Sequence, residues 1–418
     1  MEKKEVSVLD RSIKEKIPSY VHVLFDTLAA AGHRGYLVGG SLRDLLRGVA
    51  PHDYDMTTDA SPDEMLEIFA DFRVIPTGLK HGTLTVLSEG HPIEITTHRC
   101  DGEYLDARRP ESVTFTRRLA DDLARRDFTV NAMAWNEQEG LVDLFGGRED
   151  LQSGIIRAVG DPATRFSEDA LRILRAFRFS AQLDFEIEPG TLAAARERRE
   201  GLARISVERI FGELTRLLEA PAASRGLSAL LDADCGELVF FDCLPDRGAI
   251  KAIEGLAPDA ALRLSLLLLH ESPLRLHALA KRWHASNAFC DALAGVVEAA
   301  REPLPATLYH ARRFVVRYWP CWERALALRA AFGEQVEEAF VLSRTVVRDK
   351  TAVELRRLAV NGRELQDALG IRPECTGELL ARLQDLVWQK PERNKKSVLL
   401  GLAVELCREH PTFLKYKE

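Results

Sequence analysis

Two aspartates separated by one residue, Asp53 and Asp55, have the right chemistry to hold a divalent cation. Alternate residues of a strand point to one face, so a strand here would project both carboxylates together and turn Tyr54 and Met56 into the core. Mg²⁺ is usually held by one or two carboxylates together with substrate phosphates, and a metal pair can drive phosphoryl transfer. The pattern indicates a Mg²⁺ site, although Asp-x-Asp also occurs on solvated edge strands and in fragments of calcium loops.

A glycine turn, Gly39-Gly40-Ser41, lies upstream of the aspartates and follows an apolar strand at 36–38. Glycines turn sharply without a side chain, so backbone N–H groups and a new helix N-terminus can approach a phosphate. Arg43, in a predicted helix over 42–47, adds a charge-assisted donor. A Gly-Gly turn alone is an ordinary loop feature, but followed by paired carboxylates it predicts a nucleotide site.

Helices and strands alternate around these residues. Apolar spacing predicts a helix within 8–31 and another over 62–69, capped by Ser61. Strands are expected at 74–76, 82–87 and 92–96. Glu94 stands between two isoleucines on the last strand and should face away from the core, which makes it either a third catalytic carboxylate or an edge glutamate.

A second charged stretch, 166–179, predicts a helix capped by Ser167 with an apolar row and a charged row. Residues of the charged row recur at intervals of three, as helix neighbours do: Asp169, Arg172, Arg175 and Arg178. Taken alone, such a row is most often a solvated face with an ion pair. The row becomes more informative beside a third stretch, Arg125-Arg126-Asp127-Phe128-Thr129, in a segment at 123–133 predicted to open a helix.

In this order and spacing, the motifs resemble the DNA polymerase beta nucleotidyltransferase superfamily. More narrowly they are similar to class II (bacterial) tRNA nucleotidyltransferases, in the family that also contains poly(A) polymerases. The resemblance implies that Asp53 and Asp55 hold Mg²⁺ in catalysis, with Glu94 as a candidate third carboxylate. It further implies that the triphosphate is bound by Gly39, Gly40, Arg43 and Arg126.

The run Glu168-Asp169-x-x-Arg172 resembles the family motif that reads the incoming base, with Arg175 and Arg178 supporting phosphate or base. A carboxylate only accepts hydrogen bonds and a guanidinium only donates them. Cytosine and adenine both present an amino group beside a ring acceptor, which suits this pair. Uracil and guanine present a carbonyl and an N–H, two repulsive contacts. The pair would therefore select CTP and ATP without a template.

Three further segments resemble family features: 143–151 the third motif, 207–210 the fifth, and 100–116 the flexible loop of class II enzymes. The predicted fold is α+β, with a mixed-sheet nucleotidyltransferase head followed by an all-α neck, body and tail. From residue 192 onward only helices are expected. We place the head at 1–150, the neck at 151–220, the body at 221–300 and the tail at 301–418.

Composition narrows the class of protein. With 418 residues and 46% hydrophobic content, the chain should form more than one globular domain. Its formal net charge of −7 argues against indiscriminate nucleic-acid binding, so local basic clusters, such as 390–396, must contact RNA. Seven scattered cysteines without a Cys-x-x-Cys pair fit a reducing cytoplasm. No apolar run is long enough to cross a membrane.

The resemblance implies an enzyme that adds C, C and A to the 3′ end of tRNA, using CTP and ATP and releasing pyrophosphate. Expected partners are the 3′ end and acceptor arm of tRNA, with no DNA and no membrane. An enzyme adding only A, or a poly(A) polymerase, shares these motifs, although the latter usually carries a long basic C-terminal extension. A non-catalytic RNA-binding protein is the alternative from another class, but it would not need the carboxylates.

Overall fold

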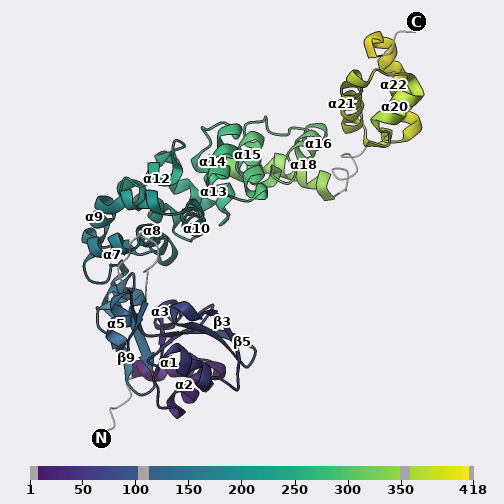
Figure 1. The fold of residues 1–418 in the computed structure, drawn as a ribbon. Helices are drawn as coiled ribbons and strands as arrows, with labels where there is room; N and C mark the ends of the chain where they lie inside the picture. Colours follow the sequence, from purple (N-terminus) through teal and green to yellow (C-terminus); the bar gives the residue numbers. More distant parts are fainter. Residues whose placement is uncertain (1–7, 102–112, 349–357, 414–418) are drawn as a thin grey trace. The chain divides into compact units, whose positions relative to one another are not determined.

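The computed structural model describes residues 8–101, 113–348 and 358–413, and it divides into two compact units, 1–244 and 245–418 (Figure 1). The predicted loop at 100–116 lies largely outside the described residues. Its two ends are described, and they pair as the antiparallel strands β6 (Arg99–Asp101) and β7 (Val113–Phe115).

A seven-stranded mixed sheet forms the centre of the first unit, in the order β3-β4-β5-β2-β1-β8-β9. Only β2 and β5 pair in parallel; the other neighbours are antiparallel. The strands are β1 (Gly35–Val38), β2 (Asp55–Thr58), β3 (Arg73–Gly78), β4 (Thr83–Ser88), β5 (His91–Thr97), β8 (Met133–Asn136) and β9 (Gly140–Asp143). The strands predicted at 74–76, 82–87 and 92–96 are confirmed.

The two faces of the sheet follow the period of two in the sequence. Leu37, Met56 and Ile95 belong to the larger hydrophobic core, packed with the N-terminal helices. Val38 faces the other way, into a second cluster with Leu123. Because directly paired residues share a face, Asp55, the partner of Val38, projects on the side away from the larger core.

Two helices, α1 (Val8–Lys16) and α2 (Ser19–Ala30), supply the apolar residues that cover the larger core, where one helix within 8–31 was predicted. The break falls at Pro18, which has no N–H to donate and disfavours helical geometry in the residue before it. Further along, Ser61 caps α4 (Pro62–Ile68), as predicted, and the structure adds a capping box with Glu64.

Two predicted helices differ from the structure. The helix expected to open at 123–133 instead ends there, because α5 (Leu119–Ala124) stops before Arg125 and only the short 3₁₀ turn η2 (Thr129–Asn131) follows. The helix expected at 166–179 is two helices, α7 (Pro162–Glu168) and α8 (Leu171–Leu183). Asp161, not Ser167, caps α7, since an Asp before a proline at the first helical position is the stronger start signal.

The remainder of the first unit is helical apart from a short parallel pair, β10 (Ile155–Ile156) with β11 (Glu186–Ile187). Its other elements are α3 (Gly39–Leu46), η1 (Leu79–His81), α6 (Gly147–Ser153), α9 (Pro189–Arg198), η3 (Arg199–Arg204), α10 (Val207–Leu218), α11 (Ala223–Asp232) and α12 (Gly236–Phe240). Helix α8 packs against both α10 and α11.

In the described part of the chain after residue 192, every helix or strand of more than one residue is a helix, as predicted. The elements described in the second unit are η4 (Arg247–Gly255), α13 (Ala260–Leu267), α14 (Pro273–Arg282), α15 (Asn287–Ala300), α16 (Leu308–Arg317), α17 (Trp322–Ala331), α18 (Glu337–Arg348), α20 (Gly362–Leu369), α21 (Pro373–Gln389), η5 (Pro391–Arg393), α22 (Lys396–Glu409) and η6 (Pro411–Phe413). Among the described residues, no helix combines the length and apolar character needed to span a bilayer.

Gly147, the first residue of α6, provides a test of how closely this helix packs against the backbone at Thr129 in the first unit. A Cβ there would lie 2.2 Å from the backbone oxygen of Thr129 and 2.9 Å from Cγ of Met133. Gly147→Ala should therefore destabilise the first unit by about 1–3 kcal/mol, because backbone must move to admit the methyl group. Thermal unfolding followed by circular dichroism measures the effect.

Gly212 within α10 is the matched control, since a Cβ there would meet only the flexible end of Arg216, at 3.8 Å. Gly212→Ala should be neutral or stabilising by up to about 1 kcal/mol, as expected for an unobstructed helix interior. Equal melting temperatures for the two variants would contradict the close approach at Gly147.

Candidate active site

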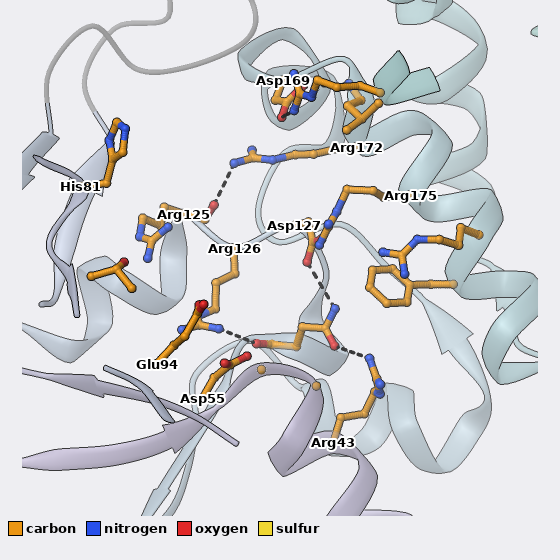
Figure 2. A pocket seen from close by; sticks show the side chains of 18 of the residues that line it. Arg43, Asp55, His81, Glu94, Arg125, Arg126, Asp127, Asp169, Arg172 and Arg175 are labelled. Atoms are coloured by element: carbon orange, nitrogen blue, oxygen red, sulfur yellow. Dashed lines mark hydrogen bonds and ion pairs between the residues drawn. The ribbon is translucent and has the colours of Figure 1, made fainter. Parts of the chain in front are cut away.

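A cavity of about 850 Å³ lies between the free face of the sheet and the helices after it (Figure 2). The sheet side contributes carboxylates and the glycine turn, and α8 contributes arginines. Of the predicted site residues, the cavity lining includes Gly39, Gly40, Arg43, Asp55, Glu94, Arg126, Asp169, Arg172, Arg175 and Arg178. Segments far apart in the sequence thus meet at one cavity, as the motif order predicted.

Asp55 and Glu94 lie side by side because β2 and β5 pair in parallel with these two residues in register. Burial raises the pKa of Asp55 to about 6, with the charges of Asp53 and Glu94 adding to the effect and Arg126 opposing it. Glu94 is exposed and its flanking isoleucines are buried, as predicted. Two carboxylate side chains therefore face the cavity from neighbouring strands.

Asp53 differs from the prediction, because it is exposed and precedes the strand instead of lying on it. The ladder with β1 ends at the pair Val38 and Asp55. Beyond Val38 the partner chain turns into α3, so Asp53 has no strand opposite it. Its charge still acts on Asp55, but the cavity lining does not include it. Within the described ranges, no three His, Cys, Asp or Glu side chains form a metal-holding group.

The glycine turn forms the start of α3, which begins at Gly39 and not at residue 42 as predicted. Gly39 has φ +70°, a conformation that strains other residues, and a Cβ there would lie 3.4 Å from Nη1 of Arg126. Arg43 donates through Nη1 to Asn131 Oδ1 at 2.9 Å and through Nε to Asp44 at 2.9 Å. The turn thus lies directly beside two arginines.

Asp169 stands in extended conformation between α7 and α8, so its carboxylate is not part of a helical row. Its Oδ1 accepts from the backbone N–H of Leu171 at 3.0 Å, and its Oδ2 accepts from Nη2 of Arg209 at 3.1 Å. Competition of this kind between a side chain and the helical backbone explains the interruption. Each oxygen keeps a further lone pair for a ligand.

Arg172 is almost fully buried and is held by three protein acceptors. Nη1 donates to Glu168 Oε2 at 2.6 Å and to the carbonyl of Arg165 at 3.2 Å, and Nη2 donates to the carbonyl of Arg125 at 3.0 Å. A guanidinium has five N–H groups, so among the described contacts Nε–H and one Nη2–H are left. Figure 2 shows the contact with Arg125 across the cavity.

Arg175 and Arg178 continue along α8. Arg175 donates through Nε to Asp127 Oδ2 at 2.8 Å, and Arg178 lies 2.6 Å from Glu213 of α10. Both guanidinium groups also lie over the ring of Phe179, at 5.4 and 4.1 Å from its centroid. These arginines line the cavity, and they also join the helix to its neighbours.

The sequence analysis missed the partners that hold these side chains: Asp122, Asp127 and Glu213 for the arginines, and Arg209 for Asp169. Burial alone would raise the pKa of Asp127, but Arg175, with smaller contributions from Arg172 and Asn131, lowers it to about 2. Asp127 lies in the motif at 125–129 and Arg209 in the motif at 207–210, so the resemblance to the family could have indicated both residues. In the sequence, Asp122 and Glu213 resemble ordinary acidic residues on a helix surface, and no motif around them indicates a buried ion pair.

Comparisons with known proteins agree with this geometry. The family described as "Poly A polymerase head domain" matches residues 35–157, and the one described as "Probable RNA and SrmB- binding site of polymerase A" matches residues 184–240. A solved structure of the Bacillus stearothermophilus CCA-adding enzyme in complex with CTP superposes with a TM-score of 0.79. It is 29% identical and covers 94% of this chain and 99% of its own.

Two curated relatives extend the likeness over almost the whole length. The CCA-adding enzyme of Enterococcus faecalis is 34% identical over 414 residues, covering 96% of this chain and 97% of its own. That of Levilactobacillus brevis is 38% identical over 393 residues, covering 91% and 96%. Since the likeness includes the sheet that carries Asp55 as well as the helical segment that contains Asp169 and Arg172, the chain belongs to the CCA-adding enzyme family of tRNA nucleotidyltransferases.

Proposed function

We propose that this chain adds C, C and A to the 3′ end of tRNA from CTP and ATP, without a template and with release of pyrophosphate. The observation that carries the proposal is the single cavity in which Asp55 and Glu94 face Asp169 and Arg172. The first pair has the chemistry for nucleotidyl transfer and the second has the chemistry for choosing a base. The relatives named above carry the same activity in their names.

Base selection follows from the contacts that Asp169 and Arg172 already make. Arg209 and the Leu171 N–H fix the carboxylate, and three acceptors fix the guanidinium. The remaining lone pairs of Asp169 accept the amino group of cytosine or adenine, and the remaining N–H groups of Arg172 donate to the neighbouring ring acceptors. Groups held this rigidly cannot rearrange for uracil or guanine, so the wrong bases leave polar groups unpaired.

Triphosphate binding falls to the glycine turn and the arginines beside it. Gly39 and Gly40 open α3, so the first N–H groups of that helix are available to phosphate oxygens. Arg126 lies next to Gly39 and adds a charged donor. Arg43 is held by Asn131 and Asp44 at the same turn and provides a second positive charge.

The carboxylates fit Mg²⁺. Asp55 and Glu94 offer hard oxygen ligands at the cavity, and Asp53 is close enough to raise the pKa of Asp55. Mg²⁺ is commonly bound by one or two protein carboxylates together with substrate phosphates. Asp55 and Glu94 would hold the ion, and the ion would supply Lewis-acid chemistry for the attacking 3′ hydroxyl and the departing pyrophosphate. The protein's own part is to align the hydroxyl and the α-phosphate while Asp169 and Arg172 hold the base.

We also propose that the protein is cytoplasmic and that its second unit contacts tRNA. All seven cysteines are free thiols, which suits a reducing compartment. Arg313, Lys390 and Lys395 are exposed in the second unit, and exposed basic side chains are suited to backbone phosphates.

The test is a set of three tRNAs, ending before CCA, after C and after CC, each offered CTP, ATP or both. The proposal expects two C additions from CTP and one A addition that requires a preceding CC. Addition of A alone, only to the tRNA ending in CC, would identify an A-adding enzyme. Long A tails would identify a poly(A) polymerase, and no transfer at all would favour an RNA-binding protein.

Asp55→Ala should lower the single-turnover rate at least about a thousandfold, because it removes the principal ligand for the cation that stabilises the transferring phosphoryl group. Affinity for tRNA should change little, since the carboxylate is not an RNA contact. Glu67→Ala, which removes an exposed carboxylate from α4, is the control and should react at the wild-type rate. A rate for Asp55→Ala within tenfold of wild type would refute the metal assignment.

Asp169→Ala should reduce discrimination against UTP and GTP by about 1–3 kcal/mol per lost contact, roughly ten- to a hundredfold, while transfer continues. Arg172→Ala should do the same from the other side of the base edge. The measurement is incorporation of each nucleotide, offered singly, onto tRNA ending before CCA.

Arg196→Ala, which breaks an exposed ion pair with Asp234, serves as the control and should leave selectivity unchanged. If Asp169→Ala remains as selective for CTP over UTP as wild type, base selection lies elsewhere.

A further inference from the structure

Asp122 of α5 is a fully buried carboxylate that holds two arginines at once. Its Oδ1 accepts from Nε and Nη2 of Arg125 at 3.0 and 2.7 Å, and its Oδ2 accepts from Nη2 of Arg126 at 3.1 Å. Burial alone would raise its pKa, but Arg126 and Arg125 together lower it to about 2. The carboxylate is therefore ionised and shared between two neighbouring cations.

Few other polar groups reach this carboxylate from the elements packed around it. Thr57 of β2 places its hydroxyl 3.5 Å from Oδ2, and His98 contacts that hydroxyl through Nδ1 at 2.8 Å. Burial and the two arginines lower the pKa of His98, so the ring is not a competing cation. Of Asp122, Thr57 and His98, only Asp122 carries a negative charge, and it is the acid that is hydrogen-bonded to both Arg125 and Arg126, although Asp55 also acts on Arg126 through its charge.

Arg125 and Arg126 both contact Asp122 and both line the cavity. Arg126 spans from Asp122 to the carbonyl of Asn131, at 3.1 and 3.4 Å, and its Nη1 lies beside the glycine turn. Arg125 has its side chain fixed by Asp122, and its backbone carbonyl accepts from Nη2 of Arg172 at 3.0 Å. Figure 2 shows Arg125 and Arg126 between Glu94 and Arg172.

We propose that Asp122 is a positioning residue for the nucleotide triphosphate, acting through Arg126. The proposal rests on the function proposed above, since it needs a triphosphate beside Gly39 and Gly40. Two guanidinium groups on adjacent residues repel each other, and in a buried site that repulsion is poorly screened. With the shared carboxylate in place, Arg126 stays extended toward the glycine turn and is preorganised for phosphate.

Asp122→Asn is the variant that tests this role, because it keeps the volume and one acceptor oxygen while removing the charge. The amide N–H₂ then faces a guanidinium, donor against donor. The dissociation constant of CTP should rise about ten- to a hundredfold, the loss expected for a charged hydrogen bond. That of CMP, which lacks the β- and γ-phosphates, should change less than about threefold. Both are measured by calorimetry with Mg²⁺ and without tRNA.

A double-mutant cycle separates positioning from a general structural role. In an Arg126→Ala background, adding Asp122→Asn should weaken CTP binding by less than about threefold, because the arginine through which it acts is gone. Fully additive losses, or equal losses for CTP and CMP, would overturn the proposal.

Asp150→Asn is the matched control, since Asp150 is also buried in the first unit, where it accepts from Thr129 Oγ1 at 2.7 Å and Arg157 Nε at 3.1 Å. It should leave the CTP dissociation constant unchanged even where it lowers the melting temperature. An equal loss in this variant would show general loosening and refute the proposal. If wild type binds CTP and transfers nothing to tRNA, the proposed function fails while the role of Asp122 is still measured.

Discussion

Repulsion between arginines is the constraint on which this site depends. Eight arginines line the cavity, although the whole chain carries a formal charge of −7. A cavity that receives a triphosphate must gather positive charge, and like charges in a half-buried space oppose folding. The structure resolves the conflict by giving each named arginine an acid: Asp44 to Arg43, Asp122 to Arg126, Glu168 to Arg172, Asp127 to Arg175, Glu213 to Arg178 and Asp169 to Arg209.

These pairings also hold the first unit together. Arg172 and Arg175 leave α8 to reach Arg125 and Asp127 in the segment after α5, and Arg209 leaves α10 to reach Asp169. The residues proposed to read the base therefore also join the sheet-bearing part of the unit to its helices. Buried ion pairs add little net stability, because desolvation offsets much of the attraction, but they fix geometry. Here the fixed geometry is the placement of the Asp169 and Arg172 side chains at the cavity.

Local patterns in the sequence predicted much of the site. Alternation placed Glu94 on the open face and Met56 in the core, and the glycine turn led to the start of a helix. Failures came where two signals competed: Asp161 with Pro162 outweighed Ser167 as a cap, and the end of β1 left Asp53 without a strand partner. Glu213 could not be predicted as the partner of Arg178, because this pair joins residues far apart in the chain. The division into head, neck, body and tail remains a prediction.

The way Asp169 and Arg172 are held limits which bases the pair can distinguish. In the proposed function, one acceptor and one set of donors, held by Arg209, Glu168 and a backbone carbonyl, distinguish bases that present an amino group beside a ring acceptor from bases that present a carbonyl beside an N–H. Cytosine and adenine both belong to the first group. An ordered product such as C-C-A also requires that adenine be chosen over cytosine at the third step. A rigid pair offers the same contacts at every step, so it cannot make that choice. A pair that treats cytosine and adenine alike does not by itself set that order.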